Sequence, residues 1–180
     1  LAVCSHPAFV RRHGGDVARR IDRQALPHTI LRAGTAEAQR LGEYLKRGGF
    51  MVVDDLHGPV QWQIFVNAMQ RALPGHLIND IKPDDELMHV LYDLNQNTQI
   101  PGRRHIAGIR SDGSAIIRMP HSPAIWRGIH DNKGRLIVAI NFNMDMGDAW
   151  EHADDPMYPV SMTSLAYQFG INYLVYAMTH

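Results

Sequence analysis

The chain has 180 residues, of which 45% are hydrophobic and 20% charged, as is typical of one globular domain that buries its own core. The formal net charge is +0, which excludes a global attraction to nucleic acid or anionic membranes. A single cysteine, Cys4, excludes an intrachain disulfide, and no apolar segment is long enough to span a bilayer. We therefore expect neither a nucleic-acid partner nor a transmembrane segment.

Residues 1–27 have weak periodicity and many arginines, and we interpret them as a poorly determined basic leader. A solvated arm explains the arginines more simply than a binding patch does. Because the chain begins with Leu, we expect a processed, altered or partial product whose signal peptide, if any, lies outside it. Residues 28–180 are predicted to form one domain.

The clearest predicted helix covers residues 35–49, with Ala38, Leu41 and Leu45 on one face. Thr35 is a suitable cap at its start, and Gly48 supplies the left-handed conformation that ends it. A short strand over residues 28–34 precedes this helix.

An apolar run, residues 50–53, follows at once and is typical of a strand covered on both faces. Residues 59–75 repeat the helical pattern, opened by Pro59 and closed by Pro74 and Gly75. Residues 76–81 form a weaker strand.

The second half contains one strong strand, residues 135–142, set up by a turn at residues 131–134. Before it, residues 84–94 are predicted to begin as a helical turn capped by Asp84, and residues 95–122 to form loops and a hairpin. Residues 161–180 form a final helix, capped by Ser161 or Thr163. Strands that alternate with amphipathic helices predict an α/β fold with a mostly parallel sheet.

Polar side chains follow the two strongest strands, at the carboxyl ends where ligands gather in such sheets. The first group is Asp54, Asp55, His57 and Gly58, and the second is Asn141, Asn143, Asp145, Asp148 and Trp150. If the two strands are neighbours, the two groups line one cleft. We take them as candidate ligand-binding residues, together with Arg127, which could bind an anion or pair with a carboxylate. Trp150 could stack on a ring of a ligand, although packing explains it more simply.

The stretch "NFNMDMGDAWEH" resembles a calcium loop, but its spacing does not fit an EF-hand. Counted from Asn141, the glycine and the glutamate each fall one place away from where that loop requires them. Capping and turn formation are the favoured interpretation, and a metal site of another kind is the alternative. We predict no cofactor, with a divalent metal left open.

The group "DDLHG" also has two interpretations. Asp54 or Asp55 could cap or position the following helix, or the carboxylates and His57 could perform acid-base chemistry or hold a hard metal ion. The sequence contains no HExxH, GxSxG, GxGxxG or phosphate-loop motif.

Three segments, "LGEYLKRGGFMVVDDLHG", "WRGIHDNKGRLIVAINFNMDMGDAWE" and "GINYLVYAMTH", resemble the bacterial domain-of-unknown-function family 4159 over residues 28–180. The resemblance implies a three-layer, flavodoxin-like fold of the class I glutamine-amidotransferase type, with helices on both faces of the sheet. It also implies export to the bacterial cell envelope or periplasm, and it supplies no reaction. An active amidotransferase needs a cysteine at a strand-to-helix elbow, and "FMVVDDLHG" has none.

Two functions therefore stay open. The first is a non-catalytic or ligand-binding module on an amidotransferase-like fold in an envelope-associated system, with an unknown small molecule or protein as its partner. The alternative is a hydrolase, metal-assisted or not, that acts on carbohydrate through the Asp and His side chains at the strand ends.

Overall fold

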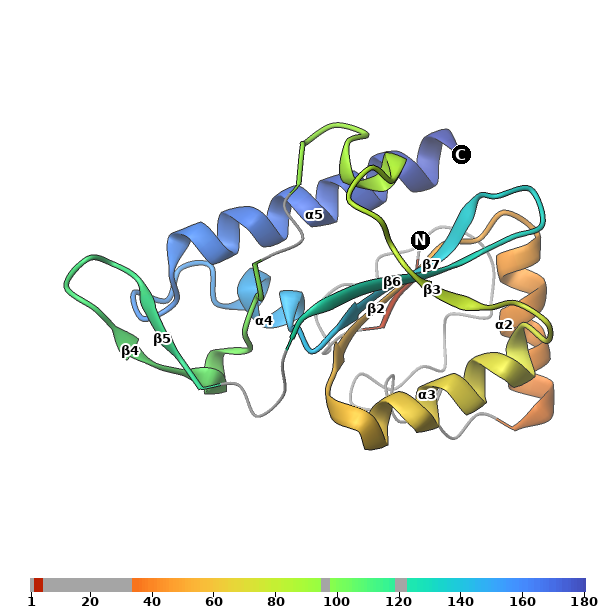
Figure 1. Ribbon diagram of the computed structural model, residues 1–180, viewed down its shortest axis with the longest axis horizontal. Helices are drawn as coiled ribbons and strands as arrows, with labels where there is room; N and C mark the ends of the chain where they lie inside the picture. The colour runs from red at the N-terminus through yellow and green to blue at the C-terminus, as the bar shows by residue number, and fades with distance from the viewer. Residues whose placement is uncertain (1, 5–33, 95–97, 119–122) are drawn as a thin grey trace.

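The computed structural model describes residues 2–4, 34–94, 98–118 and 123–180, which form a five-stranded sheet with helices on both faces (Figure 1). The predicted strand over residues 28–34 lies outside the described residues except for Gly34. Of the predicted leader, only the strand Ala2–Cys4 is described. In chain order the elements are β1 (Ala2–Cys4), α2 (Thr35–Lys46), β2 (Met51–Leu56), α3 (Gly58–Ala72), β3 (Ile78–Asp80), η2 (Glu86–Met88), η3 (Arg103–His105), β4 (Ile106–Ile109), β5 (Ala115–Ile117), β6 (Ile125–His130), β7 (Leu136–Phe142), α4 (Met146–Glu151) and α5 (Val160–Thr179).

The sheet is mixed, so the prediction of a mostly parallel, flavodoxin-like sheet is wrong. The strand order is β1-β2-β7-β6-β3. The pairs β1–β2 and β2–β7 are parallel, whereas β6–β7 and β3–β6 are antiparallel. The reason is the turn at residues 131–134, which joins β6 directly to β7. A connection this short can only make a hairpin, because a parallel pair needs a crossover of about a dozen residues or more.

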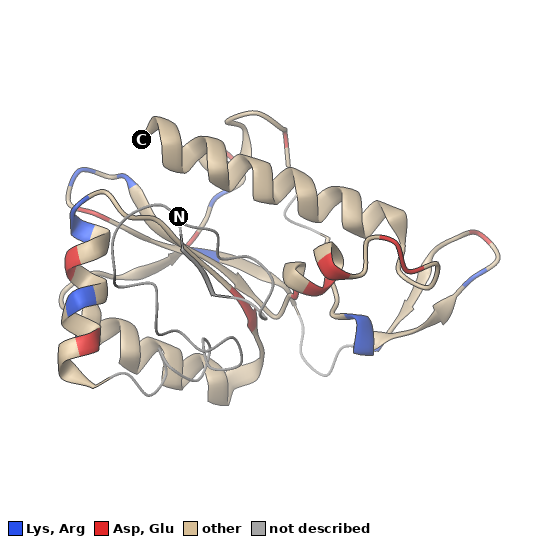
Figure 2. Ribbon diagram, turned by 180° about the vertical axis from the view of Figure 1, so that it is seen from behind, with Lys and Arg blue, Asp and Glu red and all other residues tan. Residues whose placement is uncertain are grey.

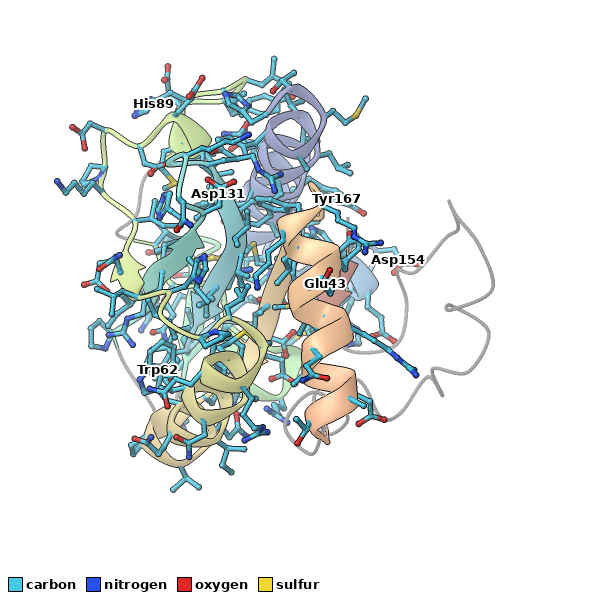
Figure 3. All side chains as sticks on the ribbon, turned by 90° about the vertical axis from the view of Figure 1, so that its right-hand side faces the viewer. Glu43, Trp62, His89, Asp131, Asp154 and Tyr167 are labelled. Atoms are coloured by element: carbon cyan, nitrogen blue, oxygen red, sulfur yellow. The ribbon has the colours of Figure 1, made fainter. Side chains whose placement is uncertain are left out.

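Each face of the sheet buries a separate apolar core. Helices α2 and α3 pack on one face through residues such as Leu45 and Phe65, which meet Val53 of β2. Helix α5 packs on the other face through Phe169 and Tyr173. In Figure 3, Trp62 marks α3 at the bottom of the molecule, and α5 lies at the top. Because side chains alternate along a strand, neighbouring residues of β2 and β7 point into different cores.

The predicted helices 35–49 and 59–75 are confirmed as α2 and α3. Helix α2 begins at Thr35, but its cap is Gly34 rather than Thr35, and the Gly34 N–H donates to the Glu37 carboxylate at 2.8 Å. Gly48 has the predicted left-handed backbone, with φ of 101°. At the same end, Arg135 donates hydrogen bonds to three carbonyl oxygens, those of Leu45, Gly48 and Gly49.

In the second half, the hairpin, the helical turn, the strong strand and the final helix were predicted, whereas β6 and α4 were not. The hairpin expected within residues 95–122 is present as β4 and β5, which form a separate two-stranded sheet away from the main one (Figure 1). The helical turn after residue 84 is η2, and its cap is Asp85 rather than Asp84. The final helix is α5, but it begins after Pro159, not at Ser161 or Thr163.

Candidate functional site

The two polar groups predicted from the sequence meet at one edge of the sheet. Strands β2 and β7 are parallel neighbours, so their carboxyl ends lie together. The two strand ends are bonded to each other by their backbones: the N–H of Asp55 donates to the Met144 carbonyl at 3.1 Å, and that of Asn143 to the Leu56 carbonyl at 2.8 Å. The Asn143 side chain accepts the N–H of Gly58 at 2.9 Å, which ties β7 to the start of α3.

Asp54 is the centre of this edge and is only 2% exposed. It points to the α5 face, where its two carboxylate oxygens accept hydrogen bonds from the Asn141 amide at 3.3 Å and from the Gly147 N–H at 2.8 Å. Asn141 in turn accepts the Tyr173 hydroxyl at 2.5 Å. Asp54 therefore connects β2, β7, α4 and, through Asn141, α5.

Asp145 is the second buried carboxylate, at 3% exposure. It caps α4, a six-residue helix that the sequence pattern did not predict, and its oxygen accepts the Asp148 N–H at 2.9 Å. The favoured interpretation of this segment as a capping turn is thus confirmed. Asp148 turns outward and accepts the N–H of Arg103 at 2.8 Å. Gly102 passes so close that a β-carbon there would lie 2.7 Å from an Asp145 oxygen.

The two buried carboxyls both have raised pKa values. Burial raises the pKa of Asp54 to about 7, although its hydrogen bonds to backbone N–H groups oppose the change. Burial, and then the charges of Asp54, Asp55 and Asp148, raise the pKa of Asp145 to about 9. For both carboxyls, the loss of hydration raises the pKa more than the hydrogen bonds lower it. Among the described side chains, the nearby Arg103 and Arg104 pair with Asp155 and Asp55 and not with these two carboxyls.

Next to this pair, the buried imidazole ring of His57 has no hydrogen-bond partner among the described residues. The residue is 8% exposed, and among the described residues neither ring nitrogen has a partner in hydrogen-bond geometry. Its Nε2 does lie 3.1 Å from the Asp55 carboxylate, the distance of an ion pair, but the contact is not aligned as a hydrogen bond. A buried imidazole gains little from a contact that is misaligned in this way.

Asp55 presents its carboxylate from a constrained backbone. Its φ is 54°, in the left-handed region that a residue other than glycine rarely occupies. The carboxylate also accepts from Arg104 at 3.3 Å. The His105 ring lies 5.7 Å from that of His57, and its Nδ1 is buried and unbonded within the described part of the chain. Burial, Arg104 and His57 lower the pKa of His105.

The sequence reasoning missed Gly102, Arg104, His105 and Tyr173 as members of this edge. The first three come from a segment of low periodicity that crosses over the strand ends. Gly102 lies against Asp145, Arg104 against Asp55 and His105 against His57, and these contacts follow from tertiary structure alone. Tyr173 had a signal, since it is a hydroxyl-bearing aromatic on the inner face of the final helix, where such a group needs a partner.

Two of the candidate residues lie elsewhere or point away. Arg127 faces the other core, where its guanidinium lies 4.3 Å from the centre of the Trp62 ring and its Nε donates to Asp80 at 2.9 Å. Trp150 packs on α5, with a ring atom 3.1 Å from where a β-carbon on Gly170 would be. Within the described ranges, no three His, Cys, Asp or Glu side chains are grouped so that they could hold a metal ion.

The site and the sheet together define an α/β domain with a mixed sheet and a buried acidic pair at the carboxyl ends of two parallel strands. The chain belongs to the family described as Domain of unknown function (DUF4159), whose model matches residues 27–178. No curated protein matches the sequence. None of the helices in the described residues has the length and apolar character that crossing a membrane requires.

Proposed function

We propose that this domain is a ligand-binding module whose recognition residues are Asp55, His57, Arg104 and His105. The observation that carries the proposal is the unbonded imidazole of His57 in a buried position. A buried polar group without a partner costs about 1–3 kcal/mol, and such groups persist where a function requires them. A ligand that bonds to this ring would recover that cost.

The surrounding groups suit a polar ligand that both donates and accepts hydrogen bonds. Asp55 offers a carboxylate, and Arg104, with a side chain 64% exposed, offers a guanidinium at the outer edge. The buried Asp54 and Asp145 hold this edge in place, because their oxygens are occupied by the strand ends and by α4. In line with the family resemblance, we assign the module to an envelope-associated bacterial system.

The proposal predicts that His57 does not stabilise the fold. Replacing it with Leu removes an unbonded buried polar group and keeps an apolar side chain of similar size, so the free energy of unfolding should rise or stay unchanged. Urea unfolding measures it. A loss of more than about 1 kcal/mol would show that the ring has a structural role, and the proposal would fail.

Binding is tested with a thermal-shift panel of magnesium, calcium, manganese and zinc chlorides, sodium phosphate, glucose, galactose and N-acetylglucosamine. We expect at least one compound to raise the melting temperature of the native protein and to lose this effect in His57→Gln. The matched control is His89→Gln. His89 is exposed, it pairs with Asp93 four residues later, and it is not one of the proposed recognition residues. An equal response of both variants, or no response of the native protein, counts against the proposed site.

A hydrolase is the second candidate, favoured by the 3.1 Å contact between Asp55 and His57. If substrate binding brings this contact into hydrogen-bond alignment, Asp55 would orient His57 as a general base toward water. Turnover of p-nitrophenyl acetate or p-nitrophenyl glycosides that disappears in His57→Gln and persists in His89→Gln would support this activity over binding alone.

A further inference from the structure

An apolar stripe runs along the outside of α5, on the side away from the sheet. The helix contains no Asp, Glu, Lys or Arg over its 20 residues, and Figure 2 shows it without a charged position. Helix α2, by contrast, alternates acidic and basic residues on its surface. Four large apolar side chains of α5 are exposed, including Val160 at 75% and Met178 at 84%. A surface helix normally has a polar outer face.

The exposed apolar residues of the molecule concentrate here. Seven of its eleven exposed large hydrophobic residues within the described ranges lie on α5, just before it or in the loop beside it, namely Leu91, Tyr92, Met157, Val160, Tyr167, Leu174 and Met178. The loop is held against the helix because Asn172 accepts the N–H of Tyr92 at 2.9 Å. A concentration of exposed apolar side chains of this kind marks an interaction surface.

The spacing of the stripe indicates what covers it. Its six members, all apolar except Ser164, recur at intervals of four, three, four, three and four residues: Val160, Ser164, Tyr167, Ile171, Leu174 and Met178. This is the seam of a helix that packs along another helix. The order of these intervals is the same from either end of the helix, and the midpoint of the series falls between Tyr167 and Ile171.

We propose that the stripe pairs with the same stripe of a second copy of the chain, with the two α5 helices antiparallel across a two-fold axis that passes between Tyr167 and Ile171. In such a pair each member of the stripe meets another member: Val160 meets Met178, Ser164 meets Leu174, and Tyr167 meets Ile171. A two-fold interface needs this self-complementary arrangement. Because the stripe has no charge, pairing it with itself brings no like charges together.

The size of the surface sets the expected affinity. A helix of 20 residues is about 30 Å long, and alone it supplies only part of the roughly 800 Å² per partner in an interface of standard size. Leu91, Tyr92 and Met157 extend the patch. We therefore expect a reversible dimer with a dissociation constant on the order of micromolar.

Analytical ultracentrifugation over a range of protein concentrations tests the proposal. The native protein should change from monomer to dimer, and Leu174→Lys, at an exposed position, should weaken the dimer by at least tenfold while circular dichroism confirms that the variant is folded. A monomer at every concentration, or a dimer that Leu174→Lys leaves unchanged, would overturn it. A monomer that sediments with phosphatidylcholine–phosphatidylglycerol vesicles would assign the stripe to lipid instead and also overturn it.

Disulfide cross-linking tests the antiparallel register independently. In a Cys4→Ser background, Ser164→Cys with Leu174→Cys should give a covalent dimer under mild oxidation. The two positions are about 15 Å apart in one helix, too far for an intrachain bond. The matched control is Ser161→Cys with Leu174→Cys, because Ser161 is exposed but off the stripe. Faster cross-linking of the control pair would refute the register.

Discussion

Replacing Asp145 with Asn is the sharpest test of the buried acidic pair, because it removes the charge and little else. Asparagine is as good a helix cap as aspartate, so the oxygen that accepts the Asp148 N–H remains. The amide has nearly the same size, so the close approach of Gly102 is also preserved. The variant therefore isolates the cost of the buried carboxylate.

The sign of the effect follows from the raised pKa of Asp145. In the unfolded chain this carboxyl loses its proton near pH 4, whereas in the folded protein it keeps the proton to about pH 9. Between these values the folded state binds more protons than the unfolded state, so the free energy of unfolding falls as the pH rises. The raised pKa of Asp54 acts in the same direction between about pH 4 and pH 7.

The magnitude is large enough to measure. A displacement from 3.8 to about 9 corresponds to ~7 kcal/mol at about 1.36 kcal/mol per pH unit. Relaxation and water entry reduce the cost of a buried charge in a real protein, so we take ~2 kcal/mol as the smallest expected gain. The gain in stability of Asp145→Asn over the native protein should be smallest at pH 5, just above the pKa of the unfolded carboxyl, and should grow to at least this amount at pH 9.

Urea unfolding followed by circular dichroism at pH 5, 7 and 9 measures both proteins, and Asp154→Asn, an exposed carboxylate nearby in sequence, is the control. The control should follow the native pH profile. If Asp145→Asn is destabilised equally at all three pH values, the carboxylate is a net stabilising group and the reasoning from burial is wrong.

Three further variants test other parts of the structure by the same urea assay. Gly102→Ala should cost about 1–3 kcal/mol, because its new methyl group meets the oxygens of Asp145 and Asp148 at 2.7 and 3.2 Å. Tyr173→Phe should cost a similar ~1–3 kcal/mol, since it leaves the buried Asn141 oxygen without its donor. Arg135→Met should cost about 1–2 kcal/mol through the lost bonds to three carbonyls at the end of α2.

Each of these variants has a matched control with the same chemical change at an open position. Gly108→Ala has its nearest foreign atom at 3.8 Å, Tyr167→Phe alters an exposed hydroxyl, and Lys133→Met removes an exposed cation. All three should change the free energy of unfolding by less than about 0.5 kcal/mol. A control variant that loses as much free energy of unfolding as its test variant would show that the named contact is not the cause of the loss.

Local patterns in the sequence were sufficient to predict most elements of the fold, because helical periodicity, glycine stops and apolar strands depend on neighbouring residues. Helices α2, α3 and α5 and strands β2 and β7 fall where these patterns put them. The sheet was mispredicted because alternation of strands and helices does not fix the direction of each strand. The short turn before Arg135 carried the necessary information, since it joins β6 and β7 as a hairpin.

The candidate site was predictable to the extent that it lies at strand ends. Asp54, Asn141 and Asp145 come together because parallel neighbours end at the same edge. The loop that carries Arg104 could not be placed there, since no local pattern says which edge a loop crosses. Arg127 was grouped with this edge although its position, one residue after the inward-facing Trp126, puts it on the opposite face.

The bond between Asn141 and Tyr173 has a consequence for the order in which the protein can form during synthesis. Asp54 leaves the ribosome early, its partner Asn141 follows 87 residues later, and Tyr173 follows after a further 32. Until α5 emerges, the acidic edge lacks the layer that buries it, and the carboxyls remain in water with ordinary affinity for protons. The raised pKa of Asp54 should therefore be absent from a nascent product that ends before Tyr173, because such a product lacks the helix that covers this edge.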